Sequence, residues 1–309
     1  MKILLANPRG FCAGVDRAIE IVERSLERYG APVYVRHEIV HNDHVVADLR
    51  EKGAVFIEDP KEAPRGEKLV FSAHGVSPEV RAAAQDQELK TLDATCPLVT
   101  KVHNEVMRLV EEDFEIVMVG HAGHVEVEGT MGHAPGRIHL VETCEDVTRL
   151  SVENPERLAC VTQTTLSVDD TREILEALGH RFPHIRLPKR DDICYATQNR
   201  QDAVATLCKE AQLILVVGAP ASSNSNRLVE VAARRSVTSF LLQSAEDLDP
   251  AWLAGVTCVG VTAGASTPEF LVEQLVERLK ELAGADTQID SIHEIDETMS
   301  FKLPTELRA

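Results

Sequence analysis

The sequence repeats one pattern three times: a cysteine, a segment with the periodicity of an amphipathic helix, a strand, and a polar turn. Three cysteines stand at the equivalent starting points, Cys12, Cys96 and Cys194. The polar turns follow after 29, 28 and 28 residues, at His41, His124 and Ser222. This repetition predicts three similar α/β repeats, whose equivalent thiols can meet on one axis.

Composition and charge limit the classes of protein to which the chain can belong. Its 309 residues include 32 Lys and Arg against 50 Asp and Glu, a net charge of −18. This charge opposes binding to nucleic acid or to an anionic membrane surface, so an anionic ligand requires a site built to hold it. No segment reaches the roughly 20 apolar residues of a membrane helix, and the first residues are too short an apolar run for a signal peptide. We therefore expect a cytoplasmic protein without a membrane partner.

The strands between the helical segments indicate the fold class. The runs 32–36, 115–120 and 213–218 are short and largely apolar. Such strands are typical of parallel sheets that helices cover on both faces. We predict an α/β protein with mainly parallel sheets in three pseudo-equivalent repeats. The predicted segments are 1–96, 97–193, 194–283 and a C-terminal tail packed on the body, 284–309.

A later strand in each repeat also ends in a polar turn. These turns contain His74, Thr164 and Ser266. Three residues are expected to cap the helices that follow, Ser77, Ser167 and Thr267, with proline at the first helical position in the first and last cases. Ligands of parallel sheets bind beyond the carboxyl ends of the strands, so we expect all six polar turns to face a common centre.

The three repeat cysteines are candidate metal ligands because each precedes a predicted helix. The helix dipole and the unpaired amides of the first turn favour a thiolate at that position. The seven cysteines are an odd number without extracellular spacing, so a disulfide framework is not expected. Four cysteines lack the repeat position and are expected to be structural, Cys144, Cys160, Cys208 and Cys258.

Three thiolates restrict the metal group that they can hold. A closed structural zinc site normally has four protein ligands, and the repeat supplies no obvious fourth. A [4Fe–4S] cluster usually takes four cysteines as well. With three, one iron keeps an open position and can act as a Lewis acid toward a substrate oxygen. The residues alone leave zinc and a cluster open, but only the second gives the chain redox chemistry.

The polar turns offer the donors that a small anion requires. Imidazole groups come from His41, His74 and His124. Hydroxyl and amide groups come from Ser222, Asn224 and Ser266, and the helix starts add backbone N–H groups. In a chain of net charge −18, this set indicates a diphosphate site that uses few Lys or Arg.

Glu126 is a candidate proton donor, because it is the carboxylate nearest these turns. It follows His124 by two residues. A glutamate can pass a proton to a leaving hydroxyl if burial raises its pKa. The sequence leaves open whether Glu126 is instead a surface glutamate. The hydroxyl of Thr164 could orient the proton path.

The segment His37–His41 matches the pattern H-E-x-x-H of zinc proteases. That motif requires a helix, so that both histidines share one face. Here the β-branched and aromatic residues of 32–36 lead straight into it and predict a strand. We therefore reject a zinc protease. Neither G-x-x-x-x-G-K-[ST] nor a strand-borne G-x-G-x-x-G is present.

Taken together, these segments resemble the 4-hydroxy-3-methylbut-2-enyl diphosphate reductase family, the LytB-type iron–sulfur enzymes that end the methylerythritol phosphate route to isoprenoids. The resemblance covers almost the whole chain. Nine matched segments carry it in order, Asn7–Val15, His37–Asn42, Phe71–Val76, Asp93–Pro97, His124–Thr130, Thr162–Ser167, Asp192–Thr197, Ser222–Arg227 and Thr262–Ser266.

The resemblance implies a three-domain α/β trefoil around a central [4Fe–4S] cluster with one iron not ligated by protein. It implies cluster ligation by Cys12, Cys96 and Cys194, and proton donation by Glu126 with Thr164 beside the substrate hydroxyl. The implied diphosphate ligands are His41, His74, His124, Ser222, Ser223, Asn224 and Ser266. The products would be isopentenyl and dimethylallyl diphosphate, and the electron donor a flavodoxin or ferredoxin.

The chain departs from the family pattern at one position. The family usually reads His-Pro-Glu-Val where this chain has His124-Val-Glu-Val, so Val125 replaces a proline that would stiffen the turn. Because the spacing to Glu126 is intact, we expect the chemistry to be unchanged and the loop to be looser. Two other functions stay open: a non-redox [4Fe–4S] dehydratase, and a metal-binding scaffold or redox sensor without catalysis.

Overall fold

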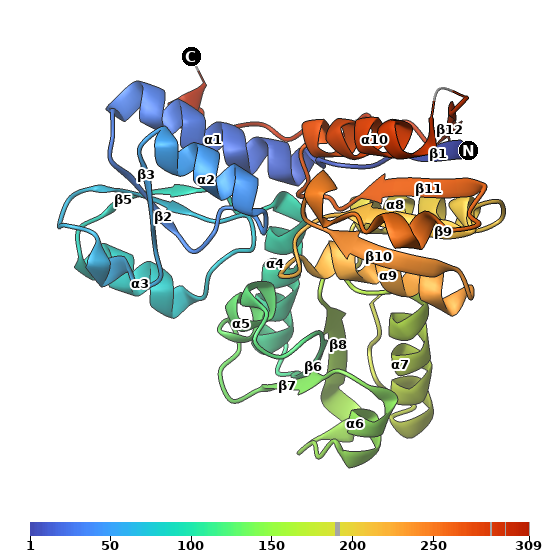
Figure 1. The fold of residues 1–309 in the computed structure, drawn as a ribbon. Helices are drawn as coiled ribbons and strands as arrows, with labels where there is room; N and C mark the ends of the chain where they lie inside the picture. Colours follow the sequence, from blue (N-terminus) through green and yellow to red (C-terminus); the bar gives the residue numbers. More distant parts are fainter. Residues whose placement is uncertain (189–191, 285, 294, 309) are drawn as a thin grey trace. The chain divides into compact units, whose positions relative to one another are not determined.

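The computed structural model describes residues 1–188, 192–284, 286–293 and 295–308. The chain forms two compact units that alternate along the sequence. Unit 1 comprises Met1–Ala13, His41–Val45 and Tyr195–Met299, and unit 2 comprises Gly14–Val40, Val46–Cys194 and the residues from Ser300 on. Figure 1 shows their helices and strands.

Unit 1 is built on a parallel sheet of five strands in the order β10-β9-β11-β1-β12. The strands are β1 (Lys2–Asn7), β9 (Leu213–Val217), β10 (Thr238–Leu242), β11 (Cys258–Ala263) and β12 (Gln288–His293). The helices are α8 (Tyr195–Leu207), α9 (Ser223–Arg234) and α10 (Glu269–Ala283). Ile3 faces a core shared with α10, whereas Leu4 faces a core shared with α8 and α9. Alternate residues of the strands therefore bury both faces of the sheet.

Unit 2 contains two further parallel sheets, in the orders β3-β2-β4-β5 and β7-β6-β8. The first has the strands β2 (Val33–Arg36), β3 (Ala54–Ile57), β4 (Lys68–Phe71) and β5 (Lys90–Asp93), and the helices α1 (Ala13–Tyr29), α2 (Asp43–Glu51) and α3 (Pro78–Asp86). The second has β6 (Glu115–Val119), β7 (Ile138–Val141) and β8 (Leu158–Thr162), with α4 (Pro97–Glu111) and α5 (Val125–Met131) in one core and α6 (Cys144–Arg149) and α7 (Val168–Arg181) in the other.

The predicted fold class is confirmed: the residues that the structure describes form three parallel sheets with helices packed against them. The division at residues 96, 193 and 283 remains a prediction. One strand was not predicted: β12 lies in the tail and pairs with β1. Its sequence gives little signal because it is an edge strand with exposed residues, among them Asp290 and Ile289.

Two of the three predicted helix caps are confirmed. Ser77 and Ser167 accept hydrogen bonds from the amides of Val80 and Asp170, at 3.3 and 3.2 Å. The prediction for Thr267 was wrong, because Pro268 is the cap residue of α10 and the helix begins one residue later. The buried Thr267 hydroxyl instead donates to the carbonyl oxygen of Val217 at 3.0 Å.

The predicted helix after each repeat cysteine is confirmed, and in α8 the apolar residues Ala203 and Leu207 are buried as predicted. The buried residues of α8 also include three polar side chains that were not predicted to be buried, Thr197, Arg200 and Gln201. A helix can bury such groups when each finds hydrogen-bond partners. The partners of Arg200 lie far away in the sequence, so local periodicity could not reveal them.

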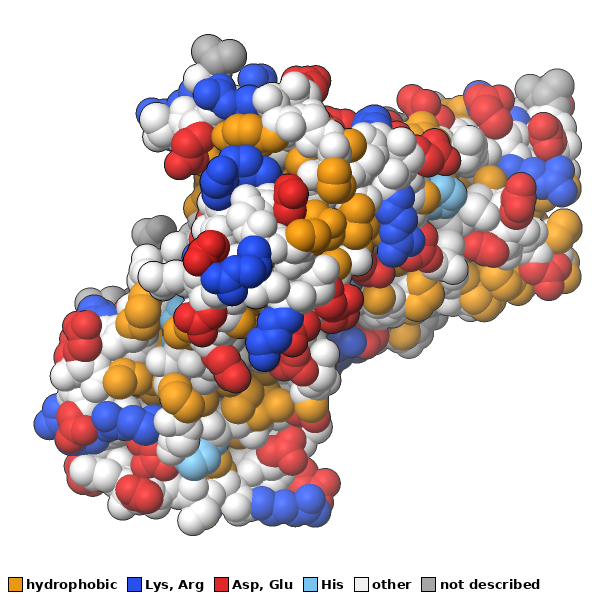
Figure 2. Space-filling model, turned by 90° about the vertical axis from the view of Figure 1, so that its left-hand side faces the viewer, with side chains coloured by type: hydrophobic (Ala, Val, Ile, Leu, Met, Phe, Trp, Pro, Cys, Tyr) orange, Lys and Arg blue, Asp and Glu red, His pale blue; other side chains and the backbone are white. Residues whose placement is uncertain are grey.

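The molecular surface in the view of Figure 2 has interspersed acidic and basic side chains, with hydrophobic side chains between them. Arg108 and Glu112 form one of the exposed ion pairs of unit 2, with 3.0 Å between nitrogen and oxygen. Among the described residues, the helices are too short or too polar to cross a membrane.

Candidate functional site

Each repeat cysteine lies immediately before a helix, as the sequence predicted. Cys12 precedes α1, Cys96 is the cap residue of α4, and Cys194 precedes α8. All three are partly buried and form no disulfide. Their thiols therefore lie at the positive ends of helix dipoles, where the thiolate form is stabilised.

The backbone around the three cysteines is equivalent. The Cys12 amide donates to the carbonyl oxygen of Ala265 at 3.2 Å, beside Ser266. The Cys96 amide donates to Ala73 at 2.9 Å, beside His74. The Cys194 amide donates to Thr164 at 3.0 Å. Each cysteine is thus joined by a backbone hydrogen bond to one of the later polar turns.

This equivalence follows from the strand order of the sheets. Cys96 follows β5, which pairs with β4, the strand that ends in the turn of His74. Cys12 follows β1, which pairs in the same way with β11. In the third case Arg186 forms a parallel bridge with Ala159 of β8, ahead of Cys194. Neighbouring parallel strands end at the same edge, so each pair delivers one cysteine and one polar turn together.

Glu126 is a buried carboxyl group in the first turn of α5, 3% exposed, and not a surface glutamate. Its two oxygens accept hydrogen bonds from the Thr164 amide at 2.7 Å and the Thr164 hydroxyl at 2.9 Å. The pKa of Glu126 is raised to about 7, mainly by burial; the Thr164 hydrogen bonds oppose this shift, and the negative charge of Asp192 adds to it. This carboxyl group can therefore both hold and release a proton near neutral pH.

His124 and His74 lie close to each other in unit 2. The His124 ring caps α5, because its Nδ1 accepts a hydrogen bond from the Glu126 amide at 3.2 Å. In neutral imidazole the proton is then on Nε2, which is a donor. The ring centroids of His74 and His124 are 6.1 Å apart and nearly perpendicular.

In unit 1 the first turn of α9 contributes Ser222, Ser223 and Asn224, all buried. Ser222 caps the helix by accepting from the Ser225 amide at 3.3 Å. Asn224 accepts from the Ala265 amide at 2.8 Å. Asn224 thus joins the start of α9 to the turn that is fastened to Cys12.

Two further candidates lie beside this helix start. The Ser266 hydroxyl donates to the backbone oxygen of His41 at 3.0 Å, which brings both residues together in unit 1. Gly218 and Gly264 permit the close approach, because a Cβ on either would collide with the Ser225 side chain. The first amides of α9 and these polar groups form a site suited to an anion.

Electrostatics also relate Cys12 to the residue that follows Cys194. Burial raises the pKa of Tyr195 to about 12, with the negative charge of the Cys12 thiolate as the next largest cause. Cys12 and Tyr195 both belong to unit 1.

The remaining cysteines differ from these three. Burial raises the pKa of Cys160, Cys208 and Cys258, which disfavours their thiolates. Cys144 is exposed at the start of the short helix α6. None of the four shares the strand pairing that delivers the repeat cysteines.

The H-E-x-x-H segment is not helical. His37 has a positive φ of 59° after the end of β2, and the next helix, α2, begins at Asp43. The zinc protease motif requires both histidines on one face of a helix, and the histidines of this segment do not meet that requirement.

Sequence reasoning missed Asp192 and Arg200. Asp192 was part of a matched segment but received no role. Its carboxylate is buried, accepts from the Thr162 amide at 3.3 Å, and has a pKa raised by burial. Both are charged residues close to Cys194 in the sequence, and this position is the signal that could have identified them.

The pKa of Glu126 predicts a pH dependence of stability. The folded pKa of about 7 lies above the ordinary glutamate pKa of 4.5, so the folded state binds more protons between these values. The contribution of Glu126 to stability is full below the lower pKa and is lost as pH rises through the upper one. Denaturation should show that the free energy of unfolding of Glu126→Gln, relative to that of the wild type, is up to about 3 kcal/mol higher at about pH 8 than at about pH 5. Equal differences at both pH values would contradict the assignment.

Replacing Val125 by proline is expected to stabilise the folded state. It is the first residue of α5, a position that accepts proline. His124 before it has φ −79° and ψ 131°, the extended conformation that a following proline favours. Thermal denaturation of Val125→Pro should show a gain of about 0.4–1 kcal/mol, because the unfolded chain loses freedom. A lower melting temperature would show that the turn is strained by proline.

Comparison with known proteins gives consistent results. A family model described as "LytB protein" matches residues 3–280. Relatives from Azoarcus sp. (strain BH72) and Nitrosomonas europaea, each named 4-hydroxy-3-methylbut-2-enyl diphosphate reductase, are 59% and 58% identical. They cover 99% and 98% of this chain, and 98% and 96% of their own lengths are matched.

Solved structures agree. The E-1-hydroxy-2-methyl-but-2-enyl-4-diphosphate reductase from Plasmodium falciparum is similar with a TM-score of 0.95 and 41% identity, over 99% of this chain and 96% of that one. Another, described as the terminal enzyme of the non-mevalonate pathway, has a TM-score of 0.65 and 34% identity, over 91% of this chain and 99% of that one. The chain therefore belongs to the LytB family of iron–sulfur reductases.

Proposed function

We propose that the chain reduces 4-hydroxy-3-methylbut-2-enyl diphosphate to isopentenyl and dimethylallyl diphosphate. Two electrons and two protons enter, the allylic C–O bond breaks, and water leaves. The observation that carries this proposal is Glu126, a buried carboxyl group with a pKa near 7 held by Thr164, whose carbonyl oxygen in turn accepts from the Cys194 amide. A proton donor and a candidate cluster ligand are thereby fixed to one turn.

The donor set of the three repeat cysteines fits a [4Fe–4S] cluster. Partly buried thiols at helix starts favour thiolates, and the equivalent strand pairings give no fourth cysteine. Cys12, Cys96 and Cys194 would hold the cluster and leave one iron without a protein ligand. When bound, such a cluster supplies electrons and a Lewis acid.

Glu126 would deliver the proton that the departing hydroxyl requires. Its pKa near 7 lets it carry this proton at neutral pH. The Thr164 hydroxyl, 2.9 Å from the Glu126 carboxyl group, would orient the substrate hydroxyl toward it. The burial of Glu126 would limit loss of this proton to water.

The diphosphate would be bound by neutral donors and helix starts. The N-terminal turns of α5 and α9 provide amides, and the residues that would bind oxygen atoms are His41, His74, His124, Ser222, Ser223, Asn224 and Ser266. Neutral donors satisfy an anion without the desolvation cost of buried Lys or Arg. The net charge of −18 makes such a local site necessary.

The source of electrons would be a small redox protein, a flavodoxin or a ferredoxin, as the family resemblance implies. A cytoplasmic location also remains a prediction. The dehydratase alternative is not favoured, because the relatives named above are reductases.

Anaerobic turnover tests the function. The protein should be brown and contain iron and sulfide, and with a chemical reductant it should convert the hydroxylated allylic diphosphate to both isomers. A dehydratase would consume the substrate without reductant. Colourless protein with stoichiometric zinc, or no product under reducing conditions, would contradict the proposal.

The role of Glu126 has a matched control in the same helix. Glu126→Gln should lower turnover by about a hundredfold or more, because a neutral amide cannot donate the proton in this way, while iron content stays at the wild-type level. Glu128→Gln alters an exposed carboxylate two residues away and should keep the wild-type rate. Wild-type turnover by Glu126→Gln would remove Glu126 from the mechanism.

A further inference from the structure

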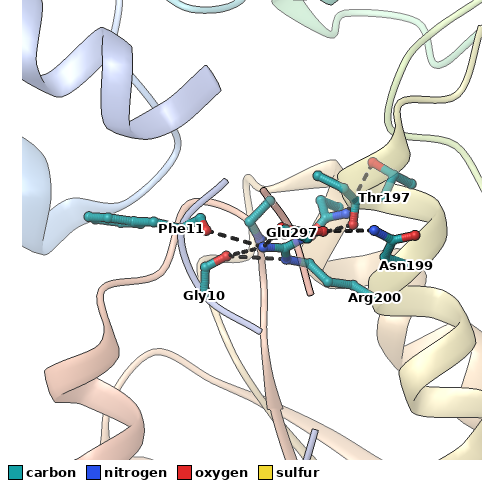
Figure 3. Close-up of polar contacts among 9 residues, drawn as sticks. Gly10, Phe11, Thr197, Asn199, Arg200 and Glu297 are labelled. Atoms are coloured by element: carbon teal, nitrogen blue, oxygen red, sulfur yellow. Dashed lines mark hydrogen bonds and ion pairs between the residues drawn. The ribbon is translucent and has the colours of Figure 1, made fainter. Parts of the chain in front are cut away.

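The turn before Cys12 is held by an arginine with no exposed surface. Arg200 of α8 donates from Nε and Nη2 to the carbonyl oxygen of Gly10, at 3.1 and 2.7 Å. Its Nη2 also approaches the carbonyl oxygen of Phe11, at 3.2 Å. Figure 3 shows the guanidinium directed at both carbonyl groups. The two peptide groups before the cysteine therefore have a fixed orientation.

The C-terminal tail balances the charge of this arginine. The Glu297 carboxylate lies 3.0 and 3.3 Å from Nη1 and Nη2 of Arg200, and it accepts a hydrogen bond from the side-chain Nδ2 of Asn199 at 3.0 Å (Figure 3). Its side chain is 14% exposed. A buried guanidinium that lost this carboxylate would be left with an uncompensated charge. The Cys12 turn thus depends on a residue of the tail.

A second arginine holds the turn before Cys96 in unit 2 in the same manner. Arg17 donates to the carbonyl oxygens of Thr95 and Asp93, at 3.1 and 3.3 Å. Its Nε donates to the carbonyl oxygen of Lys302 at 2.9 Å. The tail therefore supplies a partner to this arginine as well, five residues after Glu297.

We propose that the tail segment 297–302 positions two of the candidate cluster cysteines through these arginines. Glu297 and the carbonyl group of Lys302 fix Arg200 and Arg17, which in turn fix the backbone before Cys12 and Cys96. This inference rests on the proposed function insofar as those cysteines hold the cluster. Arg200, Arg17 and Glu297 are positioning residues, and their loss changes how firmly the cofactor is retained.

The chemistry of arginine explains why this residue type stands at both places. A guanidinium offers five N–H donors in a rigid plane, so it reaches the carbonyl groups of two nearby residues and a third partner at once. A lysine ammonium is a point charge on a flexible stem and cannot hold this geometry. Arg17→Lys therefore removes the fixation while it keeps the charge, and Glu297→Gln removes the balancing charge while it keeps the size.

Amide hydrogen exchange of the anaerobically isolated full-length protein tests the positioning directly. Glu297→Gln should speed exchange at the Cys12 amide by about tenfold and leave the Cys96 amide unchanged, because one charge-assisted contact is lost locally. Arg17→Lys should show the reverse selectivity. The exposed pair Arg278 and Glu281 supplies the matched controls, Arg278→Lys and Glu281→Gln, which should alter neither amide. Equal acceleration at both turns, or none, would overturn the proposal.

Cluster retention provides the second measurement. Under an anaerobic iron chelator, both variants should lose the visible absorption of the cluster several-fold faster than wild type and the controls. If the variants show faster amide exchange at the cysteine turns but lose the cluster at the wild-type rate, the link between the tail and cofactor retention is refuted. If the wild-type protein binds no cluster, the proposed function fails, and the exchange data alone then decide whether the tail fixes the turns.

Discussion

A backbone hydrogen bond organises the candidate site. Each repeat cysteine donates its amide to the carbonyl oxygen of a polar turn. For Cys12 and Cys96 the turn and the cysteine follow neighbouring parallel strands, and for Cys194 a single parallel bridge precedes the cysteine. This bond places a thiol at a helix start and, next to it, the polar group that would meet the substrate. A chain of net charge −18 can hold anionic groups in this way, because helix N-termini and neutral donors replace Lys and Arg.

The same arrangement explains why residues far apart in the sequence act together. β1 lies at the start of the chain, yet it pairs with β11 and β12 near the end. The strand that leads to Cys12 therefore completes the sheet that also carries Ser222 and Ser266. The tail then returns to the cysteine turns through Arg200 and Arg17. The C-terminus is thus a part of the site's support, although its sequence has no obvious motif.

Local signals explain what the sequence could predict. Helix starts at the cysteines, the apolar strands and the caps Ser77 and Ser167 depend on neighbouring residues, and the repeat adds their equivalence. The features that the sequence did not predict depend on packing between residues far apart in the chain. The burial of Glu126 depends on Thr164, 38 residues away, and the burial of Arg200 depends on Gly10, 190 residues away. Thr267 looked like a cap, but its hydroxyl bonds to a neighbouring strand.

The central claim is that three thiolates hold one iron–sulfur cluster and leave one iron open to the substrate. Mössbauer spectroscopy of the anaerobically reconstituted protein tests it most directly. The account predicts that one iron in four differs from the other three, and that its signal changes when the hydroxylated allylic diphosphate is added. Four irons with equivalent signals that ignore the diphosphate, or the absence of an iron–sulfur signal, would contradict it.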